Sequence, residues 1–147
     1  MPTFTTRRVD TADRVVREAL ASLALDCFGP GELTRLTASW FLGGTWWVVR
    51  EAGREVAFAG LRPSVRWDRT GYLALAGVLP AARGHGLQKR LTRLRLAECR
   101  RQGWQWAITD TLDNPASACS LISCGFRPYH PAVTWAAQRS TYWRKRL

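Results

Sequence analysis

The stretch Val78-Leu79-Pro80-Ala81-Ala82-Arg83-Gly84-His85-Gly86-Leu87-Gln88 joins two segments of different hydrophobic periodicity. Residues 72–79 form an apolar run that predicts a β-strand, and residues 87–101 have the one-sided apolar spacing of an α-helix. Glycines at 84 and 86 allow a positive φ and let a ligand approach the backbone closely. A helix that begins just after such a loop presents N–H groups and a partial positive charge to a phosphate. The stretch therefore predicts a strand, an anion-binding loop and a helix.

Strands and helices alternate on both sides of this unit. The expected strands are residues 3–9, 45–51, 55–65, 72–79, 104–110, 126–129 and 140–146, and the expected helices run from Asp10 or Thr11 to the break at 29–31, over 32–41, over 87–101 and from Asn114 to Gly125. The apolar stripes of the first and third helices are expected at Val15, Val16, Ala19, Leu20 and Leu23 and at Leu87, Leu91, Leu94 and Ala97. The resulting order, β-α-α-β-β-β-α-β-α-β-β, indicates an α/β protein.

The length of 147 residues, 46% of them hydrophobic, predicts one domain with a substantial core. No apolar stretch approaches the roughly 20 residues that span a membrane, and residues 1–8 lack the apolar core of an export signal. The four cysteines have neither Cys-x-x-Cys spacing nor partner histidines, so we expect reduced thiols and no metal site. These features predict a cytoplasmic protein without a membrane segment.

The net charge of +11 and the pI near 10.9 are compatible with two kinds of ligand. A basic surface can bind the phosphates of nucleic acid, and it can also attract a phosphate-bearing cofactor. Twenty of the twenty-two basic residues are arginine, a bias that genome composition can produce without selection for function. Charge alone therefore leaves both a nucleic-acid-binding module and an enzyme with an anionic cofactor as alternatives.

The spacing Val-x-Pro-x-x-Arg-Gly-His-Gly-Leu-Gln resembles the acyl-CoA pyrophosphate loop of the GNAT superfamily of N-acetyltransferases, whose pattern is Gln/Arg-x-x-Gly-x-Gly/Ala. Gln88 replaces the last small residue of that pattern; it narrows the start of the helix, but its amide could itself donate to a phosphate. The resemblance implies that the cofactor's pyrophosphate binds at Arg83, Gly84, His85, Gly86, Leu87 and Gln88. It also implies that the Val78 N–H polarises the thioester carbonyl.

A second segment, Asn114-Pro115-Ala116-Ser117 followed by Gly125-Phe126, is similar to the second cofactor segment of that family. The similarity implies that the Asn114 side chain hydrogen-bonds the pantetheine arm of acetyl-CoA, with Ser117 beside it. The alternative is that Asn114 only caps the following helix. Both roles can coexist in one side chain.

The catalytic residues of the family do not carry over directly. The usual tyrosine acid falls on Leu121, and the usual glutamate bases fall on Thr109 and Tyr72. An acceptor ammonium with a pKa near 10 must nevertheless lose a proton before it can attack a thioester. Tyr72 could relay that proton through water, and Asp110 is the nearest carboxylate in sequence. Strand alternation counts against Asp110, since Thr109 and Thr111 would share the opposite face.

The resemblance covers the whole chain, 1–147, and implies one GNAT acyltransferase domain with a mixed sheet, flanking helices and splayed central strands. The short set Asn-x-x-Ser, Gly-Phe and Tyr142-Trp143-Arg144 also resembles small phage and bacterial members of the family, which is a weaker resemblance. The implied reaction moves an acetyl group from acetyl-CoA to a primary amine by direct attack. The amine belongs to a small molecule, a peptide or a protein, and the enzyme is a monomer or a homodimer. The alternative is a basic nucleic-acid or protein-binding module that keeps the fold without turnover.

Overall fold

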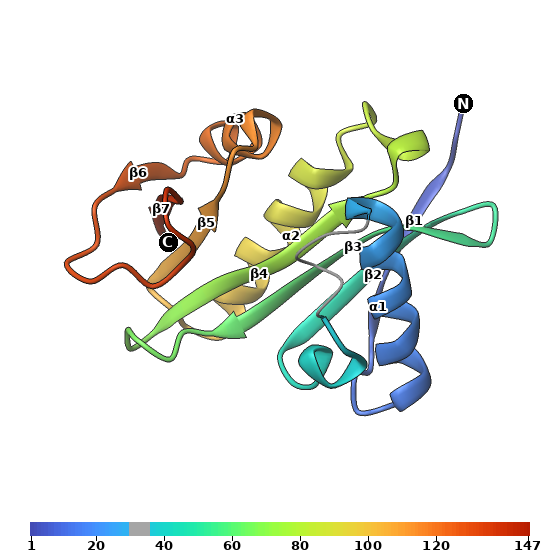
Figure 1. Cartoon of the computed structure of the whole chain (residues 1–147), viewed down its shortest axis with the longest axis horizontal. Helices are drawn as coiled ribbons and strands as arrows, with labels where there is room; N and C mark the ends of the chain where they lie inside the picture. Colours follow the sequence, from blue (N-terminus) through green and yellow to red (C-terminus); the bar gives the residue numbers. More distant parts are fainter. Residues whose placement is uncertain (30–35) are drawn as a thin grey trace. The chain divides into compact units, whose positions relative to one another are not determined.

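The structure, a computed structural model, describes residues 1–29 and 36–147 and has a mixed α/β architecture (Figure 1). In chain order the elements, with η for 3₁₀ helices, are β1 (Phe4–Val9), α1 (Arg14–Phe28), η2 (Ala38–Phe41), β2 (Thr45–Glu51), β3 (Arg54–Pro63), β4 (Thr70–Val78), η3 (Pro80–Ala82), α2 (Leu87–Arg101), β5 (Trp106–Thr111), α3 (Pro115–Ser123), β6 (Arg127–Tyr129) and β7 (Thr141–Arg146). The strands form a seven-stranded sheet in the order β1-β2-β3-β4-β5-β7-β6. Because β4 and β5 are parallel and the β1–β2, β2–β3, β5–β7 and β6–β7 pairs are antiparallel, the predicted mixed sheet is confirmed.

Several predicted boundaries differ from those in the structure; β4, for example, begins at Thr70 rather than at 72. The helix expected over 32–41 lies partly outside the described residues, and its described end is the short η2. β3 ends at Pro63 rather than at 65, since the next residue, Ser64, turns to donate its N–H to Thr70. β5 begins at Trp106 rather than at 104, because the N–H groups of residues 105 and 106 both point to the Arg69 carbonyl.

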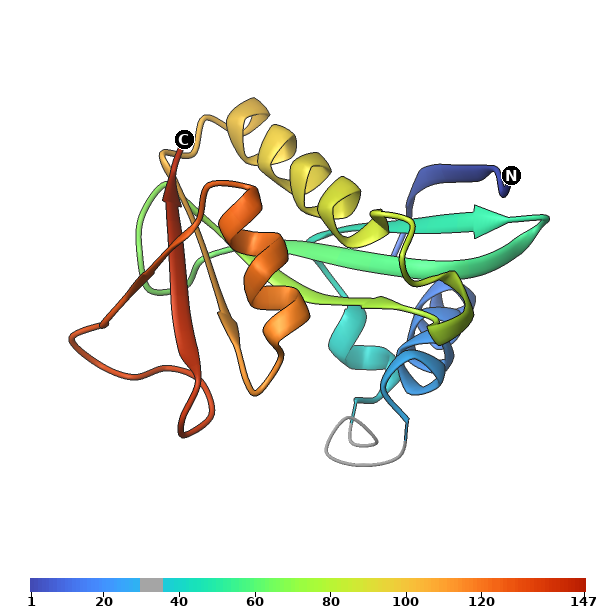
Figure 2. The ribbon, with the colours of Figure 1, turned by 90° about the horizontal axis from the view of Figure 1, so that it is seen from above.

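The chain folds into two compact units, residues 1–62 with 74–87 and residues 63–73 with 88–147. In the first unit, α1 and η2 lie on the same side of β2 and β3 (Figure 2). The ring of Phe58 there stacks on Trp46 at 6.4 Å and meets Phe28 and Phe41 edge-on. α1 buries Leu20, Leu23, Ala24 and Cys27. The predicted stripe was therefore right at Leu20 and Leu23 and wrong at Val15, which is 71% exposed, and at Ala19, which is also exposed.

In the second unit, the predicted stripe of α2 is only partly the buried side. The buried residues are Leu87, Leu91, Thr92, Arg95, Leu96, Glu98 and Cys99; they include the predicted Leu87 and Leu91, whereas the predicted Leu94 is half-buried and Ala97 is exposed. Arg95 is only 4% exposed and donates to the Leu91 carbonyl and the Thr92 hydroxyl. The opposite side of α2 carries exposed basic residues, as predicted.

Gly60 of β3 gives a stability prediction for the first unit. A Cβ at this position would lie 2.5 Å from the ring of Trp46, which is fully buried between Phe41 and Phe58. We expect Gly60→Ala to lower the free energy of unfolding by about 1–3 kcal/mol, because the ring must leave its packed position. Urea denaturation measures the change. In Gly53→Ala, where nothing lies within 4 Å, only the strain at φ 77° should remain. Equal losses in the two variants would contradict the steric explanation.

Candidate functional site

The loop between η3 and α2 has the backbone conformation that its glycines allow. Gly84 and Gly86 adopt φ values of 86° and 73°, in the left-handed region that other residues rarely enter. A Cβ built on either glycine would meet nothing within 4 Å, so space above the loop is open. α2 begins at the next residue, Leu87, whose side chain is buried. An exposed glycine loop therefore leads directly into a helix N-terminus, the arrangement that binds phosphate groups.

Arg83 fixes the start of this loop. Its guanidinium donates to the Val78 carbonyl at 3.3 Å and to the Cys27 carbonyl at 3.1 Å, so the loop is tied to the end of α1. Its own N–H donates to the Pro80 carbonyl. Arg83 thus positions the loop, and the amides that can face a ligand begin at Gly84. Burial raises the pKa of the nearby Cys27 thiol to about 11, and the charge of Arg83 offsets only part of that effect.

His85 lies within the loop and is exposed. Its ring centroid is 5.3 Å from that of Phe4, the first residue of β1, with the rings inclined at 51°. This contact holds the imidazole beside the strand that begins the first unit.

In the second unit, Gln88, Ser117 and Asn114 form a connected chain of hydrogen bonds. Gln88 Nε2 donates to Ser117 Oγ at 2.7 Å, and Ser117 N donates to Asn114 Oδ1 at 3.1 Å. The second bond caps α3, so the capping role considered for Asn114 is present. Since its Oδ1 accepts from the cap, the Asn114 side-chain amide keeps its two N–H donors for another partner. The residue that departs from the family pattern, Gln88, is the one that connects the two motifs.

Tyr72 and Asp110, the two catalytic candidates, lie together in the second unit. The parallel ladder pairs Thr70–Tyr72 of β4 with Trp106–Ile108 of β5, which places Tyr72 and Asp110 on one face of the sheet. The Tyr72 hydroxyl is 3.5 Å from Asp110 Oδ1 and donates to it. Burial raises the pKa of the half-buried Asp110 carboxyl above its ordinary value, and the Tyr72 hydrogen bond opposes that rise. The alternation that counted against Asp110 is real, but it brings this carboxylate to the face of Tyr72.

Two of the positions where the family places an acid or a base, Leu121 and Thr109, have structural roles here, as does the neighbouring Thr111. Leu121 is 6% exposed, within the buried side of α3. The Thr109 hydroxyl is buried and donates to the Leu73 carbonyl at 2.9 Å. Thr111 accepts from the indole N–H of Trp143. None of these three side chains is placed to exchange a proton with a substrate.

Sequence reasoning missed an aromatic cluster around Tyr72. Trp135, in the loop before β7, packs edge-on against Tyr72 with ring centroids 5.7 Å apart and against Tyr142 at 4.9 Å. The Tyr142 hydroxyl accepts from the N–H groups of Trp135 and Ala136 and so holds this loop in place. Tyr142 is the cross-strand partner of Asp110. The cluster depends on the β5–β7 register, and the sequence does not determine that register.

Comparison with known proteins gives a consistent result. The sequence model of the acetyltransferase (GNAT) family matches residues 17–126, whereas no curated protein sequence matches the chain significantly. The fold matches that of yncA from Salmonella typhimurium, solved with its cofactor acetyl-CoA, at a TM-score of 0.72 and 23% identity over 97% of this chain and 93% of that one. It also matches a ribosomal-protein-alanine N-acetyltransferase from Brucella melitensis at a TM-score of 0.73 and 20% identity, over 97% and 99% of the two chains.

A phosphinothricin acetyltransferase from Sinorhizobium meliloti, in complex with acetyl-CoA, gives a TM-score of 0.72 at 20% identity over 99% of this chain and 89% of that one. At these identities the solved structures establish a shared fold. The family match supports membership of the family as well as the fold, because the matched residues run from α1 through the glycine loop to Phe126. It includes both segments in which the sequence resembled acetyltransferases. The chain belongs to the GNAT family of acetyltransferases.

Proposed function

We propose that this protein transfers an acetyl group from acetyl-CoA to a primary amine by direct attack of the amine on the thioester. Both compact units together form the single acetyltransferase domain. The observation that carries the proposal is the open glycine loop at the N-terminus of α2, in a chain of this family. Within the described residues, no helix is long and apolar enough to cross a bilayer. We assign the activity to the cytoplasm, where the four free cysteines would stay reduced.

Cofactor binding is assigned to both motifs. The contacts proposed are Val78, Arg83, Gly84, His85, Gly86, Leu87, Gln88, Asn114 and Ser117. The amides from Gly84 onward receive the pyrophosphate, supported by the partial positive charge of the helix N-terminus. Arg83 holds the loop and adds a positive charge nearby. The Asn114 amide donates to the pantetheine arm, and the Val78 N–H polarises the thioester carbonyl.

Asp110 is the proposed base, with Tyr72 as its positioning residue. The carboxylate attracts the acceptor's ammonium group and takes one proton from it, which leaves a lone pair on nitrogen for attack. That lone pair forms the amide bond as the carbon–sulfur bond breaks, and the electron pair leaves with the CoA thiolate. The second proton that the nitrogen loses passes to solvent water, from which the thiolate can take it up. Leu121 offers no proton to the thiolate, whose pKa near 8.5 makes it a stable leaving group without one.

The direct test has two parts. Calorimetric titration should show binding of acetyl-CoA, and a panel of primary amines should then release free CoA thiol, followed with a colorimetric thiol reagent. Duplex DNA at physiological salt is the comparison ligand, because its binding by basic residues weakens steeply with salt. Tighter binding of DNA than of acetyl-CoA, with no thiol released by any amine, would favour the alternative of a binding module without turnover.

Two variants separate the capping role of Asn114 from its proposed cofactor role. Asn114→Ser keeps a side-chain oxygen for the Ser117 N–H but removes the amide donors, so it should keep thermal stability and weaken acetyl-CoA binding by about tenfold. Asn114→Ala removes both features and should also lower the free energy of unfolding by about 1 kcal/mol. Calorimetry and thermal denaturation measure the two effects. Unchanged acetyl-CoA affinity in Asn114→Ser would leave this residue as a cap alone.

A further inference from the structure

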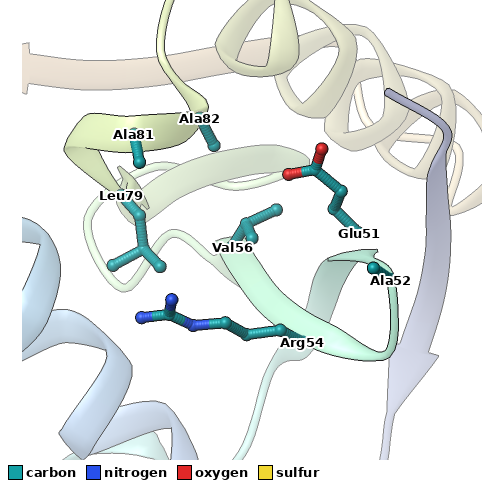
Figure 3. A pocket seen from close by; sticks show the side chains of 7 residues that line it. All are labelled: Glu51, Ala52, Arg54, Val56, Leu79, Ala81 and Ala82. Atoms are coloured by element: carbon teal, nitrogen blue, oxygen red, sulfur yellow. The ribbon is translucent and has the colours of Figure 1, made fainter. Parts of the chain in front are cut away.

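A cavity of about 310 Å³ lies in the first unit, between the β2–β3 turn and η3 (Figure 3). Its apolar lining includes Val56 of β3, Leu79 and Ala82, and the Leu79 N–H donates to the Val56 carbonyl at 2.8 Å. Its charged groups are Glu51, the last residue of β2, and Arg54, the first of β3. The cavity therefore combines two opposite charges with an apolar floor, and the transfer reaction proposed above uses neither charge.

Glu51 and Arg54 are cross-strand partners, yet their charged groups are held apart. Figure 3 shows the Glu51 carboxylate and the Arg54 guanidinium on opposite sides of Val56. The next cross-strand pair, Arg50 and Glu55, does form an ion pair, with 3.2 Å between Nη2 and Oε1. Within the described part of the chain neither Glu51 nor Arg54 has an ion-pair partner. Both charges remain available to a ligand.

The chemistry of the lining defines a class of ligand. Glu51 suits an ammonium group, the planar guanidinium of Arg54 suits a carboxylate, and the apolar residues between them suit a short hydrocarbon body. The volume of the cavity is that of about ten water molecules in the liquid. It lies near the lower limit of small-molecule sites and is too small for a nucleotide cofactor. We propose that this cavity binds a small zwitterion of the free amino acid class.

The wall of the cavity continues into the cofactor loop. Ala81 and Ala82 of η3 line the cavity, and Arg83 follows directly, with its N–H on the Pro80 carbonyl. The cavity therefore borders the segment that leads into Gly84. Only this adjacency relates it to the proposed cofactor site.

The probes are ω-amino acids of increasing length, from glycine to 6-aminohexanoate, titrated calorimetrically without acetyl-CoA so that no transfer can occur. We expect one length to bind with a dissociation constant on the order of 1 mM, as is typical of a ligand of fewer than about ten heavy atoms. The alkylamine and the alkanoate of the same length should bind at least about tenfold more weakly, because each lacks one charge-assisted contact.

Glu51→Gln and Arg54→Gln should each abolish this binding. Glu18→Gln and Arg14→Gln are matched controls in an exposed α1 ion pair and should preserve it. The proposal is wrong if no ω-amino acid binds, or if binding survives both cavity variants. The proposal is also wrong if Arg54→Gln weakens the binding of acetyl-CoA instead, because the cavity then belongs to the cofactor site. Zwitterion binding without any acetyl-CoA binding would support the cavity and overturn the proposed function.

Discussion

Acetyl-CoA at about one hundred times its dissociation constant should raise the free energy of unfolding by about 2.7 kcal/mol, and Gly86→Val should abolish that increase. Binding to the folded state alone produces the stabilisation. Gly86 lies at φ 73° with no atom within 4 Å of an added Cβ, so a valine side chain would project into the open space above the loop. That is the space assigned to the pyrophosphate. Thermal denaturation with and without acetyl-CoA measures the difference.

Gly103→Val is the matched control for this experiment. Gly103 has a φ of 75° and also has nothing within 4 Å of an added Cβ, but it lies after α2, at the opposite end of that helix from the loop. The strain of a valine in the left-handed region should therefore lower stability similarly in both variants, while only the control keeps the acetyl-CoA stabilisation. A full stabilisation in Gly86→Val would remove the loop from the cofactor site.

The elements around the glycine loop could be predicted from the sequence because their signals are local. The two glycines and the start of α2 lie within residues 84–87, and the apolar periods of the strand and the helix are read from the segments on either side of them. Asn114 and Pro115 likewise mark the start of α3, where proline is favoured at the first helical position. Local chemistry decides each of these features.

The buried side of α2 was predicted only in part, because two of its members, Arg95 and Glu98, are charged. Arg95 is polar in any hydrophobicity pattern, yet it occupies the interior, where burial lowers its pKa to about 10. The apolar period of α2 therefore predicts Leu94 and Ala97 as buried, whereas in the structure Leu94 is half-buried and Ala97 is exposed. Hydrogen bonds to Leu91 and Thr92 within α2, which hydrophobic periodicity does not include, help to compensate this buried cation.

The catalytic candidates show the same limit. Tyr72 and Asp110 could each be singled out, but their contact depends on which residues of β4 and β5 are paired, a register fixed by non-local packing. Alternation within β5 alone gave the correct face for Asp110, but it does not show that Tyr72 lies on that face. The position of Trp135 depends on a loop that Tyr142 holds from another strand. Pairwise geometry of this kind becomes visible only in the folded chain.

Asp110→Asn should lower kcat/KM by about 10²–10³-fold at pH 7 and change the shape of the pH profile. In the wild type, kcat/KM should rise as the Asp110 carboxyl ionises, at a pH above the usual aspartate range because burial raises its pKa. It should then stay level to about pH 9.5, since the carboxylate supplies the base and no tyrosine replaces Leu121. In the variant only free amine reacts, so the rate should climb about tenfold per pH unit until the amine is deprotonated.

Two further variants show whether Asp110 acts in this way. Asp68→Asn, the same change at an exposed aspartate of the second unit, should leave the profile unaltered. Tyr72→Phe removes a hydrogen bond that lowers the Asp110 pKa, so the rising limb should move to higher pH while a level region remains. A parallel loss at every pH in Asp110→Asn would show that the carboxylate only supports the fold. A descending limb below about pH 9.5 that disappears in Tyr72→Phe would instead make Tyr72 the acid that protonates the leaving thiolate.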